Sequence, residues 1–512
     1  DDALRVETES PLPLNQWHHV AATYDGSRMA EGVRIYVDGV AQKTRAVLDE
    51  LNQSFAVKEP LRVGGGGGPE NRFRGGISGV RVYRVALPAV QVAVLATATP
   101  VSELAKIEPA KRTPAQADKL TLCFLDQHAP ADLREAWNAV KAARKERDHM
   151  LESVPTVMVM QEREKARDTF VLIRGAYDRP GEKVSPGVPA VLTPLPAGVP
   201  NNRLGFAKWL VDPQNPLTAR VTVNRFWQMF FGTGIVKTVE DFGSQGEWPT
   251  HPELLDWLAT EFQRTGWDMK AIVRTIVTSA TYRQASKVTP ELLQKDPENR
   301  LLARGPRVRL PAEMVRDQAL ELAGLLVEKV GGPSVKPYQP AGLWKELGGE
   351  DYHQDHGENL YRRSLYTFWK RTAPPPAMMT FDAAGREACT VRETRTNTPL
   401  QALDLMNDVT YVEASRKLAE RMMTEGGTNP AERIAYGFRL ATAHAPAAEQ
   451  SRVLLETYQH YRDTYQTRRE AALKLLSEGE ARRNEKLDAS DLAAYTMVAS
   501  LILNLDQTVT KE

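Results

Sequence analysis

The sequence is poor in the residues that identify a chemistry at once. It has 512 residues but only two cysteines, Cys123 and Cys389, which excludes a disulfide framework and a cysteine-rich zinc site. No Cys-x-x-Cys-His motif occurs, so the chain attaches no c-type haem itself. The 66 basic and 65 acidic residues leave a formal net charge of +1, which provides no general attraction for nucleic acid or an anionic membrane.

Long apolar runs are also missing. The longest one near either end, Met497–Leu505, is too short and too interrupted to span a bilayer, so we expect no membrane span. No signal peptide is visible, and we expect the first residues to lie within a domain whose start is missing. The glycine run Gly64–Gly68 is not followed by the Lys-Ser/Thr of a phosphate-binding loop and therefore predicts a turn. With 42% hydrophobic residues, the chain can form two to four domains with real cores.

Residues 1–98 show the alternation of β-strands. Trp17–Tyr24 and Val33–Val37 alternate between apolar and polar residues, and an Asp-Gly pair that favours a tight turn follows each of them. Phe73–Tyr83 predicts a further pair of strands. Short strands at regular spacing predict an antiparallel β-sandwich.

These segments together resemble the concanavalin-A/laminin-G-like jelly roll. They match about the last two thirds of such a domain, so we expect residues 1–98 to form an incomplete sandwich that is truncated at its N-terminus. Some laminin-G-like domains bind calcium, and Asp25, Asp38 and Glu70 could supply oxygen ligands here.

Beyond residue 98 the periodicity becomes helical. Residues 99–154 predict a polar helical linker that contains the mixed charge run Lys141–Asp148, expected to be a solvated helix. Residues 155–512 predict a mostly α-helical domain with a small β element formed by Thr156–Met160 and Thr169–Ile173. The overall class is multidomain α+β. Helix starts are expected near Asn202, Pro216, His251 and Asp268, and further helices over 311–330, 398–424, 446–478 and, as a last amphipathic helix, 491–505.

Several ordered blocks from about residue 155 to the end resemble one known family. They include Asn215–Trp227, His251–Leu258, Ser279–Arg283, Leu360–Thr372 and Asn397–Leu403. The family is the Planctomycete-specific C-terminal domain of unknown function found on planctomycete cytochrome-c-containing proteins. The resemblance supplies no established reaction and no established catalytic residues.

The resemblance has consequences for compartment and partners. Such proteins usually carry a cytochrome-c module upstream of a laminin-G-like insert, so haem c is expected only on that missing upstream module. Because c-type haem is attached outside the cytoplasmic membrane, the resemblance implies a periplasmic or extracellular protein. The upstream cytochrome module of the parent protein is then one expected partner.

The stretch Thr380–Asp408 is the densest in polar and charged residues. Guanidinium groups bind carboxylate, sulfate or phosphate through two parallel hydrogen bonds, so this stretch and the neighbouring block after Leu360 could line a pocket for an acidic sugar. The alternative is that the arginines pair with Asp382, Glu387, Glu393 and Asp404 inside a helical core. The candidate ligand-binding residues are Tyr361, Arg362, Arg363, Asp382, Arg386, Cys389, Arg392, Arg395 and Asn397.

The sequence also offers a candidate reactive cysteine and a candidate metal site. Flanking arginines would favour the thiolate of Cys389, which would suit a nucleophile or soft metal ligand, although a buried inert cysteine fits the same sequence. His353 and His356 lie three residues apart with Asp355 between them, a set that could bind zinc or iron on a helical turn. Gly348, Gly349 and Gly357 favour a solvated loop instead.

The sequence favours an exported module of a cytochrome-linked or glycan-handling protein. The sandwich would bind carbohydrate or a protein surface, and the helical domain would bind an anionic ligand or a partner. One alternative is a hydrolase or oxidoreductase that acts on acidic polysaccharide, although no paired carboxylates can be assigned. Another is an envelope scaffold without catalytic activity.

Overall fold

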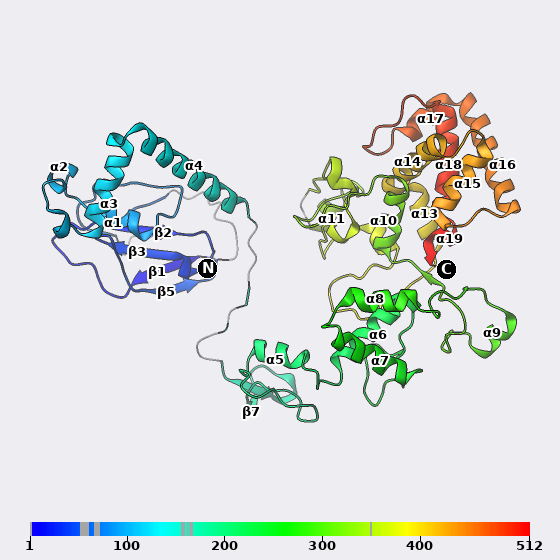
Figure 1. Ribbon diagram of the computed structural model, residues 1–512, viewed down its shortest axis with the longest axis horizontal. Coiled ribbons are helices and arrows are strands. Elements are labelled where there is room, and N and C mark those ends of the chain that lie inside the picture. Colours follow the sequence, from blue (N-terminus) through cyan, green and yellow to red (C-terminus); the bar gives the residue numbers. More distant parts are fainter. Residues whose placement is uncertain are drawn as a thin grey trace. The chain divides into compact units, whose positions relative to one another are not determined.

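The computed structural model of the protein describes residues 3–51, 61–65, 72–154, 159–160, 162, 167–348 and 351–511. The chain divides into two compact units, Asp1–Arg167 and Asp168–Glu512 (Figure 1). In the described part of the chain, no helix is long and apolar enough to cross a membrane.

The first unit contains two small antiparallel sheets. Strand β1 (Leu4–Thr8) pairs with β5 (Thr44–Asp49), and β2 (Val20–Tyr24), β3 (Val33–Val37) and β4 (Val40–Ala41) form the second sheet in that order. The predicted Asp-Gly turn after β3 has positive φ at both residues, as a two-residue hairpin requires. These sheets agree with the expected antiparallel class.

The prediction of strands over Phe73–Tyr83 is wrong. These residues contain no strand, and Val80 and Val82 are exposed. An alternating segment becomes a strand only where another strand offers a ladder of backbone hydrogen bonds. Four helices follow this segment: α1 (Ala89–Ala96), α2 (Val101–Leu104), α3 (Pro114–Cys123) and α4 (Ala131–Ser153).

Helix α4 contains the predicted charge run Lys141–Asp148, and it is largely exposed, which confirms a solvated helix. The second unit begins with a hairpin of β6 (Thr169–Leu172) and β7 (Pro180–Val184). The first predicted strand, Thr156–Met160, lies mostly outside the described residues. The partner of β6 is β7, from a Pro/Gly-rich stretch where no strand was expected.

The second unit then forms a first helical lobe around α6, α7 and α8. Its helices begin where the sequence predicts, and the side chains of Asn202 and Asp268 accept hydrogen bonds from the backbone N–H groups of Gly205 and Ala271. The core contains Val223, Leu258 and Ile272. The helices are α5 (Arg203–Leu210), α6 (Thr218–Phe231), α7 (Pro252–Arg264) and α8 (Met269–Thr278), followed by α9 (Pro290–Lys295) and β8 (Val308–Arg309).

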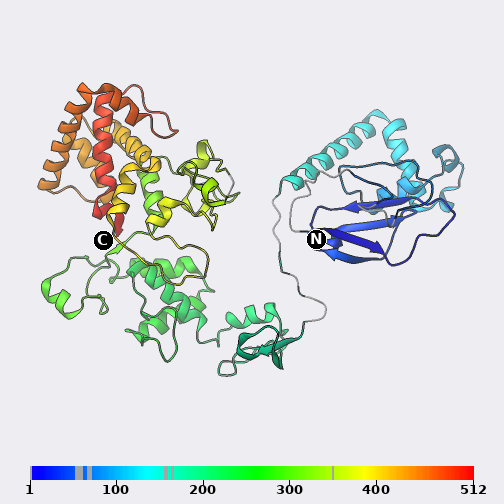
Figure 2. The ribbon, with the colours of Figure 1, turned by 180° about the vertical axis from the view of Figure 1, so that it is seen from behind.

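A second helical lobe surrounds α18 (Ala489–Leu503). This helix was expected to be amphipathic, but it is buried nearly all round because α14, α16 and α17 pack against it (Figure 2). The other elements of this lobe are α10 (Ala312–Leu322), α11 (Leu343–Gly348), α12 (Pro376–Thr380), α13 (Pro399–Asn407), α14 (Val409–Glu425), α15 (Pro430–Thr442), α16 (Ala448–Thr467), α17 (Arg469–Leu476), α19 (Asp506–Val509) and β9 (Thr510–Lys511).

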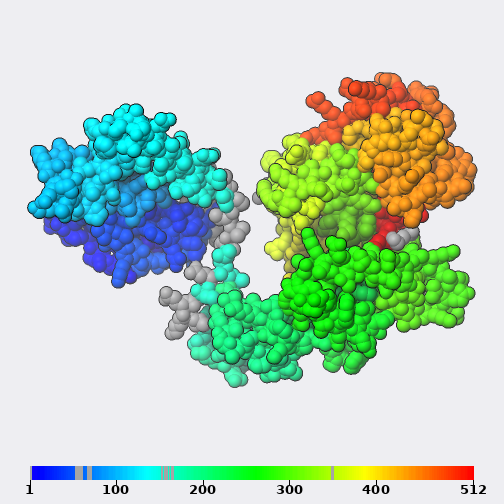
Figure 3. Space-filling model, in the orientation of Figure 1, coloured from blue at the N-terminus to red at the C-terminus, as the bar shows by residue number. Residues whose placement is uncertain are grey.

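The two lobes are joined where β8 pairs with β9. Val308 lies opposite Lys511, and the Lys511 ammonium donates a 2.7 Å hydrogen bond to the Phe230 carbonyl in α6. Gly232 ends α6 with φ 78°, and a Cβ there would lie 2.3 Å from the Val308 side chain, so only glycine allows this close approach. Figure 3 shows the green first lobe and the yellow-green-to-red second lobe meeting at this junction.

The buried side chain of Asn224 stabilises the end of the first lobe. Its amide nitrogen donates to the Val236 carbonyl and its amide oxygen accepts from the Val236 N–H, both at 2.9 Å. Asn224→Ala should lower the free energy of unfolding of the second unit by about 3 kcal/mol, because both backbone groups lose their partner. Urea titration followed by circular dichroism measures this. Gln466→Ala, at an exposed amide on α16, should change it by less than about 0.5 kcal/mol; equal effects of the two variants would contradict the assignment.

Candidate anion-binding cavity

A cavity of about 1250 Å³ lies at the junction of the two lobes. Its walls come from α6, from β8 and the start of α10, from the segment 386–397, and from β9. Segments that lie almost 300 residues apart in sequence therefore meet around one space.

The lining of the cavity is strongly basic. Four of its basic side chains come from the blocks predicted to bind a ligand: Arg363, Arg386, Arg392 and Arg395. Four more come from distant elements: Arg225, Arg307, Arg309 and Lys511. Only four acidic side chains share the lining: Glu313, Asp317, Glu393 and Asp506. This excess of positive charge favours an anion in the cavity.

The structure brings together five of the nine predicted ligand-binding residues, since Asn397 also lines the cavity. The sequence could not assign Arg225, Arg307, Arg309 and Lys511 to the same site, because these residues approach the others only where the two lobes meet. One signal was available: Arg225 lies inside the Asn215–Trp227 block that carries the family resemblance.

Asp382 supports the cavity instead of lining it. Its carboxylate accepts 2.7 Å hydrogen bonds from the N–H and the hydroxyl of Thr396, and a longer one from the buried amide of Gln401. The Gln401 amide also donates to the Thr380 carbonyl at 3.0 Å. These bonds tie together the two ends of the segment that presents Arg386, Arg392 and Arg395.

The arginines of the cavity are not neutralised in a packed core. Arg386, Arg392 and Arg395 are exposed, and the Arg386 guanidinium lies 4.3 Å from the ring centroid of Trp369. Among the predicted ion pairs, Glu387 contacts Arg371 at 3.8 Å, outside the cavity lining. The alternative of a helical core filled with arginine–carboxylate pairs therefore does not describe this segment.

Two guanidinium nitrogens of the cavity lining are buried without a hydrogen-bond partner among the described residues. The Nε–H groups of Arg309 and Arg363 are buried and donate no hydrogen bond to any described residue. Burial lowers the pKa of Arg309, opposed by the charges of Asp506 and Asp382, yet a guanidinium remains protonated at neutral pH. Arg307 differs because it pairs with Asp506. A bound anion would offset the cost of burying these charges.

Lys511 occupies the junction itself. Besides its bond to the Phe230 carbonyl, its ammonium lies 4.0 Å from the ring centroid of Tyr282. Burial, with a smaller contribution from the nearby charge of Arg395, lowers the pKa of Lys511 to about 8. This lysine is therefore charged at neutral pH but close to its titration range.

Tyr361 and Arg362, also predicted as ligand-binding residues, do not line the cavity; they belong to the core of the second lobe. The Tyr361 hydroxyl donates to the buried carboxylate of Glu413 at 3.1 Å, and burial raises the pKa of both groups. The Arg362 guanidinium donates to three backbone carbonyls and lies 3.8 Å from the Tyr366 ring centroid. Both residues stabilise the fold around the neighbouring Arg363.

Cys389 is exposed, so the prediction of a buried inert cysteine is wrong. It is not part of the cavity lining, although it lies in the segment that forms one wall. That lining contains neither His353 nor His356, the histidines of the predicted loop.

The residues predicted to bind a metal have other contacts. The Asp355 carboxylate accepts a 2.7 Å hydrogen bond from the Lys336 N–H, and the His356 ring lies 2.7 Å from Glu480. His353 is exposed. Within the described residues, no three histidine, cysteine or acidic side chains are grouped so that they could hold a metal ion.

The candidate calcium ligands of the first unit can be followed only in part. Asp25 accepts a hydrogen bond from the Ser27 N–H, and Asp38 contacts the His18 ring and the His19 N–H. Hydrogen bonds to these groups lower the pKa of both aspartates. Glu70 lies outside the described residues.

Comparison with known families places both units. Residues 202–458 match PSD1, described as Protein of unknown function (DUF1553), and residues 1–93 match Laminin_G_3, described as the Concanavalin A-like lectin/glucanases superfamily. Because the first match covers half of the chain, the chain belongs to the PSD1 family. No curated protein and no solved structure matches it. Both resemblances predicted from the sequence are thus confirmed. All the arginines that line the cavity lie within residues 202–458, the part that matches PSD1.

The lowered pKa of Lys511 predicts a pH effect on stability. Between pH 8 and 10.5 the lysine is more protonated in the unfolded chain than in the folded protein, so this group makes stability rise with pH in that window and fall as pH drops through it. Urea unfolding of the protein and of Lys511→Met across pH 7–10.5 measures the difference. The slope of the wild type should exceed that of the variant between pH 8 and 10.5; identical slopes would show that Lys511 titrates normally.

Proposed function

We propose that the second unit binds an acidic glycan in the cavity between its lobes. The observation that carries this proposal is the convergence of eight basic side chains from five parts of the chain on one space. Such an arrangement is costly in a protein that has no anion to bind, because like charges repel and two of the guanidinium groups are partly desolvated.

The chemistry of the lining supports carboxylate or sulfate as the group recognised. Guanidinium groups offer paired N–H donors that match two oxygens of such an anion. Asn397 adds a neutral amide that can donate to and accept from hydroxyl groups. The volume of about 1250 Å³ exceeds that of a typical small-molecule pocket, which favours a ligand of several sugar units.

The concanavalin A-like unit supports carbohydrate binding by a separate surface. Its Trp17 is 74% exposed, and Gly76 lies so close to the indole that a Cβ there would be 2.9 Å from the ring. A large exposed aromatic ring can stack on the apolar face of a sugar. We propose that this unit holds a glycan while the second unit recognises its acidic groups.

The setting proposed for this module is an exported, cytochrome-linked protein that handles glycans. Its support is the resemblance of the PSD1 part to domains carried by cytochrome-c-containing proteins, because c-type haem is attached outside the cytoplasmic membrane. Any haem would belong to another module of the parent protein.

A second candidate is catalysis on the bound polysaccharide. Among the four acids of the cavity, Asp317 accepts two hydrogen bonds from Ser364 and Asp506 pairs with Arg307. Glu313 and Glu393 remain as the acids that would serve as general acid and base in a hydrolase.

The binding proposal is tested with tetragalacturonate, an oligosaccharide with one carboxylate on each sugar. Combined Arg392→Gln and Arg395→Gln substitutions should weaken its binding roughly 10- to 100-fold, because charge-assisted hydrogen bonds are lost. Isothermal titration calorimetry measures the dissociation constant, and a glycan array shows whether neutral glycans bind as well.

Arg371→Gln is the matched control, since this exposed arginine lies near the same segment but outside the lining. It should bind tetragalacturonate as the wild type does. Binding should also weaken as salt concentration rises. Equal affinity of the double variant and the control, or no binding by the wild type to any acidic glycan, would refute the proposed function.

A further inference from the structure

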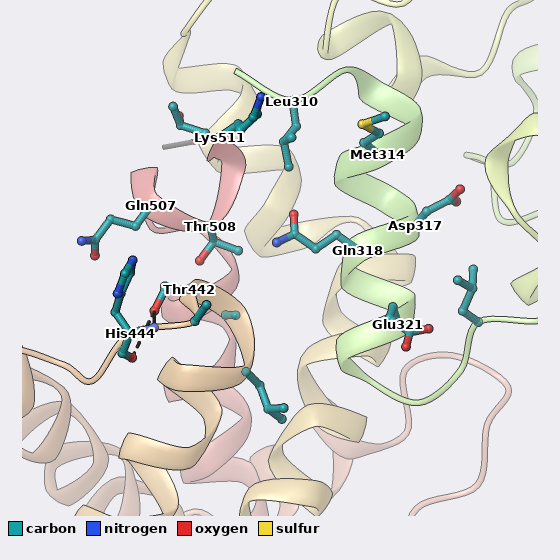
Figure 4. A pocket seen from close by; sticks show the side chains of 15 residues that line it. Leu310, Met314, Asp317, Gln318, Glu321, Thr442, His444, Gln507, Thr508 and Lys511 are labelled. Atoms are coloured by element: carbon teal, nitrogen blue, oxygen red, sulfur yellow. Dashed lines mark hydrogen bonds between the residues drawn. The ribbon is translucent and has the colours of Figure 1, made fainter. Parts of the chain in front are cut away.

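A second cavity of about 590 Å³ adjoins the basic one. It lies between α10, the end of α15, and the segment of α19 and β9 (Figure 4). Both cavities include Leu310, Met314, Asp317, Thr510 and Lys511 in their walls, so the two spaces are direct neighbours.

The walls of the second cavity combine uncharged polar groups with a larger apolar surface. Gln318 extends from α10 toward Thr508, and His444 lies beside Gln507 on the opposite wall (Figure 4). Ala443 adopts a left-handed conformation with φ 59°, which turns the chain at the end of α15 so that the residues on both sides of it line the cavity. Leu310, Met314 and Leu440 add an apolar surface.

Several of these polar groups have unused hydrogen-bonding capacity. The side chains of Gln318 and His444 make no hydrogen bond with other described residues. The Gln507 amide oxygen accepts from Gln450 at 3.0 Å, which leaves its NH₂ group available. Amides and an imidazole above an apolar surface suit a sugar ring, which carries hydroxyl or acetamido groups around an apolar face.

The charge of the second cavity is opposite to that of the first. Its charged side chains are two acids, Asp317 and Glu321, and one base, Lys511. Asp317 is already bonded to Ser364, whereas Glu321 has no such partner in the described structure. An anionic sugar would be repelled here and attracted to the neighbouring cavity.

We propose that the two cavities together bind a glycan in which an acidic sugar is linked to a neutral, hydroxyl- or acetamido-bearing sugar. The acidic unit occupies the basic cavity and the neutral unit occupies the second one. This inference rests on the proposed function, which by itself requires only an acidic ligand.

The test compares two tetrasaccharides by calorimetry on the full chain. A hyaluronan tetrasaccharide alternates glucuronate with N-acetylglucosamine, whereas tetragalacturonate is acidic throughout. The hyaluronan tetrasaccharide should bind the wild type at least tenfold more tightly, although it carries fewer charges. Gln318→Ala should remove most of that difference by weakening only the hyaluronan tetrasaccharide, and Gln466→Ala should not change it.

Glu321→Lys is a second test variant, and its expected effect is a gain of affinity instead of the loss of a contact. It replaces the repelling carboxylate with an ammonium, so it should strengthen tetragalacturonate binding several-fold and thereby reduce the preference for the hyaluronan tetrasaccharide. If tetragalacturonate binds as well as the alternating ligand and neither substitution alters the ratio, the inference is wrong while the proposed function stands. If neither tetrasaccharide binds the wild type, both are wrong.

Discussion

The short antiparallel pairing of β8 with β9 is the constraint on which both cavities depend. It joins residues 308–309 to residues 510–511 and thereby fixes the first helical lobe against the second. Arg309 lines the basic cavity from one strand, and Lys511 lines both cavities from the other. The bond from Lys511 to α6 and the close approach of Gly232 to Val308 add contacts at the same place. A sheet of only two residue pairs thus determines how side chains from both lobes meet around the cavities.

The segment 386–397 illustrates how the second lobe holds charges apart instead of neutralising them. Asp382 and Arg386 both adopt left-handed conformations, with φ 62° and 60°, which cost roughly 1 kcal/mol each for residues other than glycine. The hydrogen bonds that the Asp382 carboxylate accepts from Thr396 offset that cost and fix the ends of the segment. The backbone is therefore shaped by an acid that faces inward, while the arginines face the cavity.

Much of the helical architecture could be predicted from the sequence, because caps such as Asn202 and Asp268 and the apolar stripes of α6–α8 are local signals. The local density of arginines also identified one wall of the cavity. The sequence could not separate Arg363, which lines the cavity, from its neighbour Arg362, which is buried against backbone carbonyls, since adjacent side chains point in different directions. Nor could it associate Arg309 and Lys511 with the same site, because their proximity depends on tertiary pairing. The alternation of Phe73–Tyr83 was misleading because the described chain offers these residues no neighbouring strand.

The contact between Arg386 and Trp369 has an optical consequence. A guanidinium 4.3 Å from an indole ring influences the emission of that tryptophan through its charge. An anion that draws Arg386 away from the ring would alter this influence, so the emission of Trp369 reports on what binds to Arg386. The signal can be isolated from the other eight tryptophans of the chain by comparison with a Trp369→Phe protein.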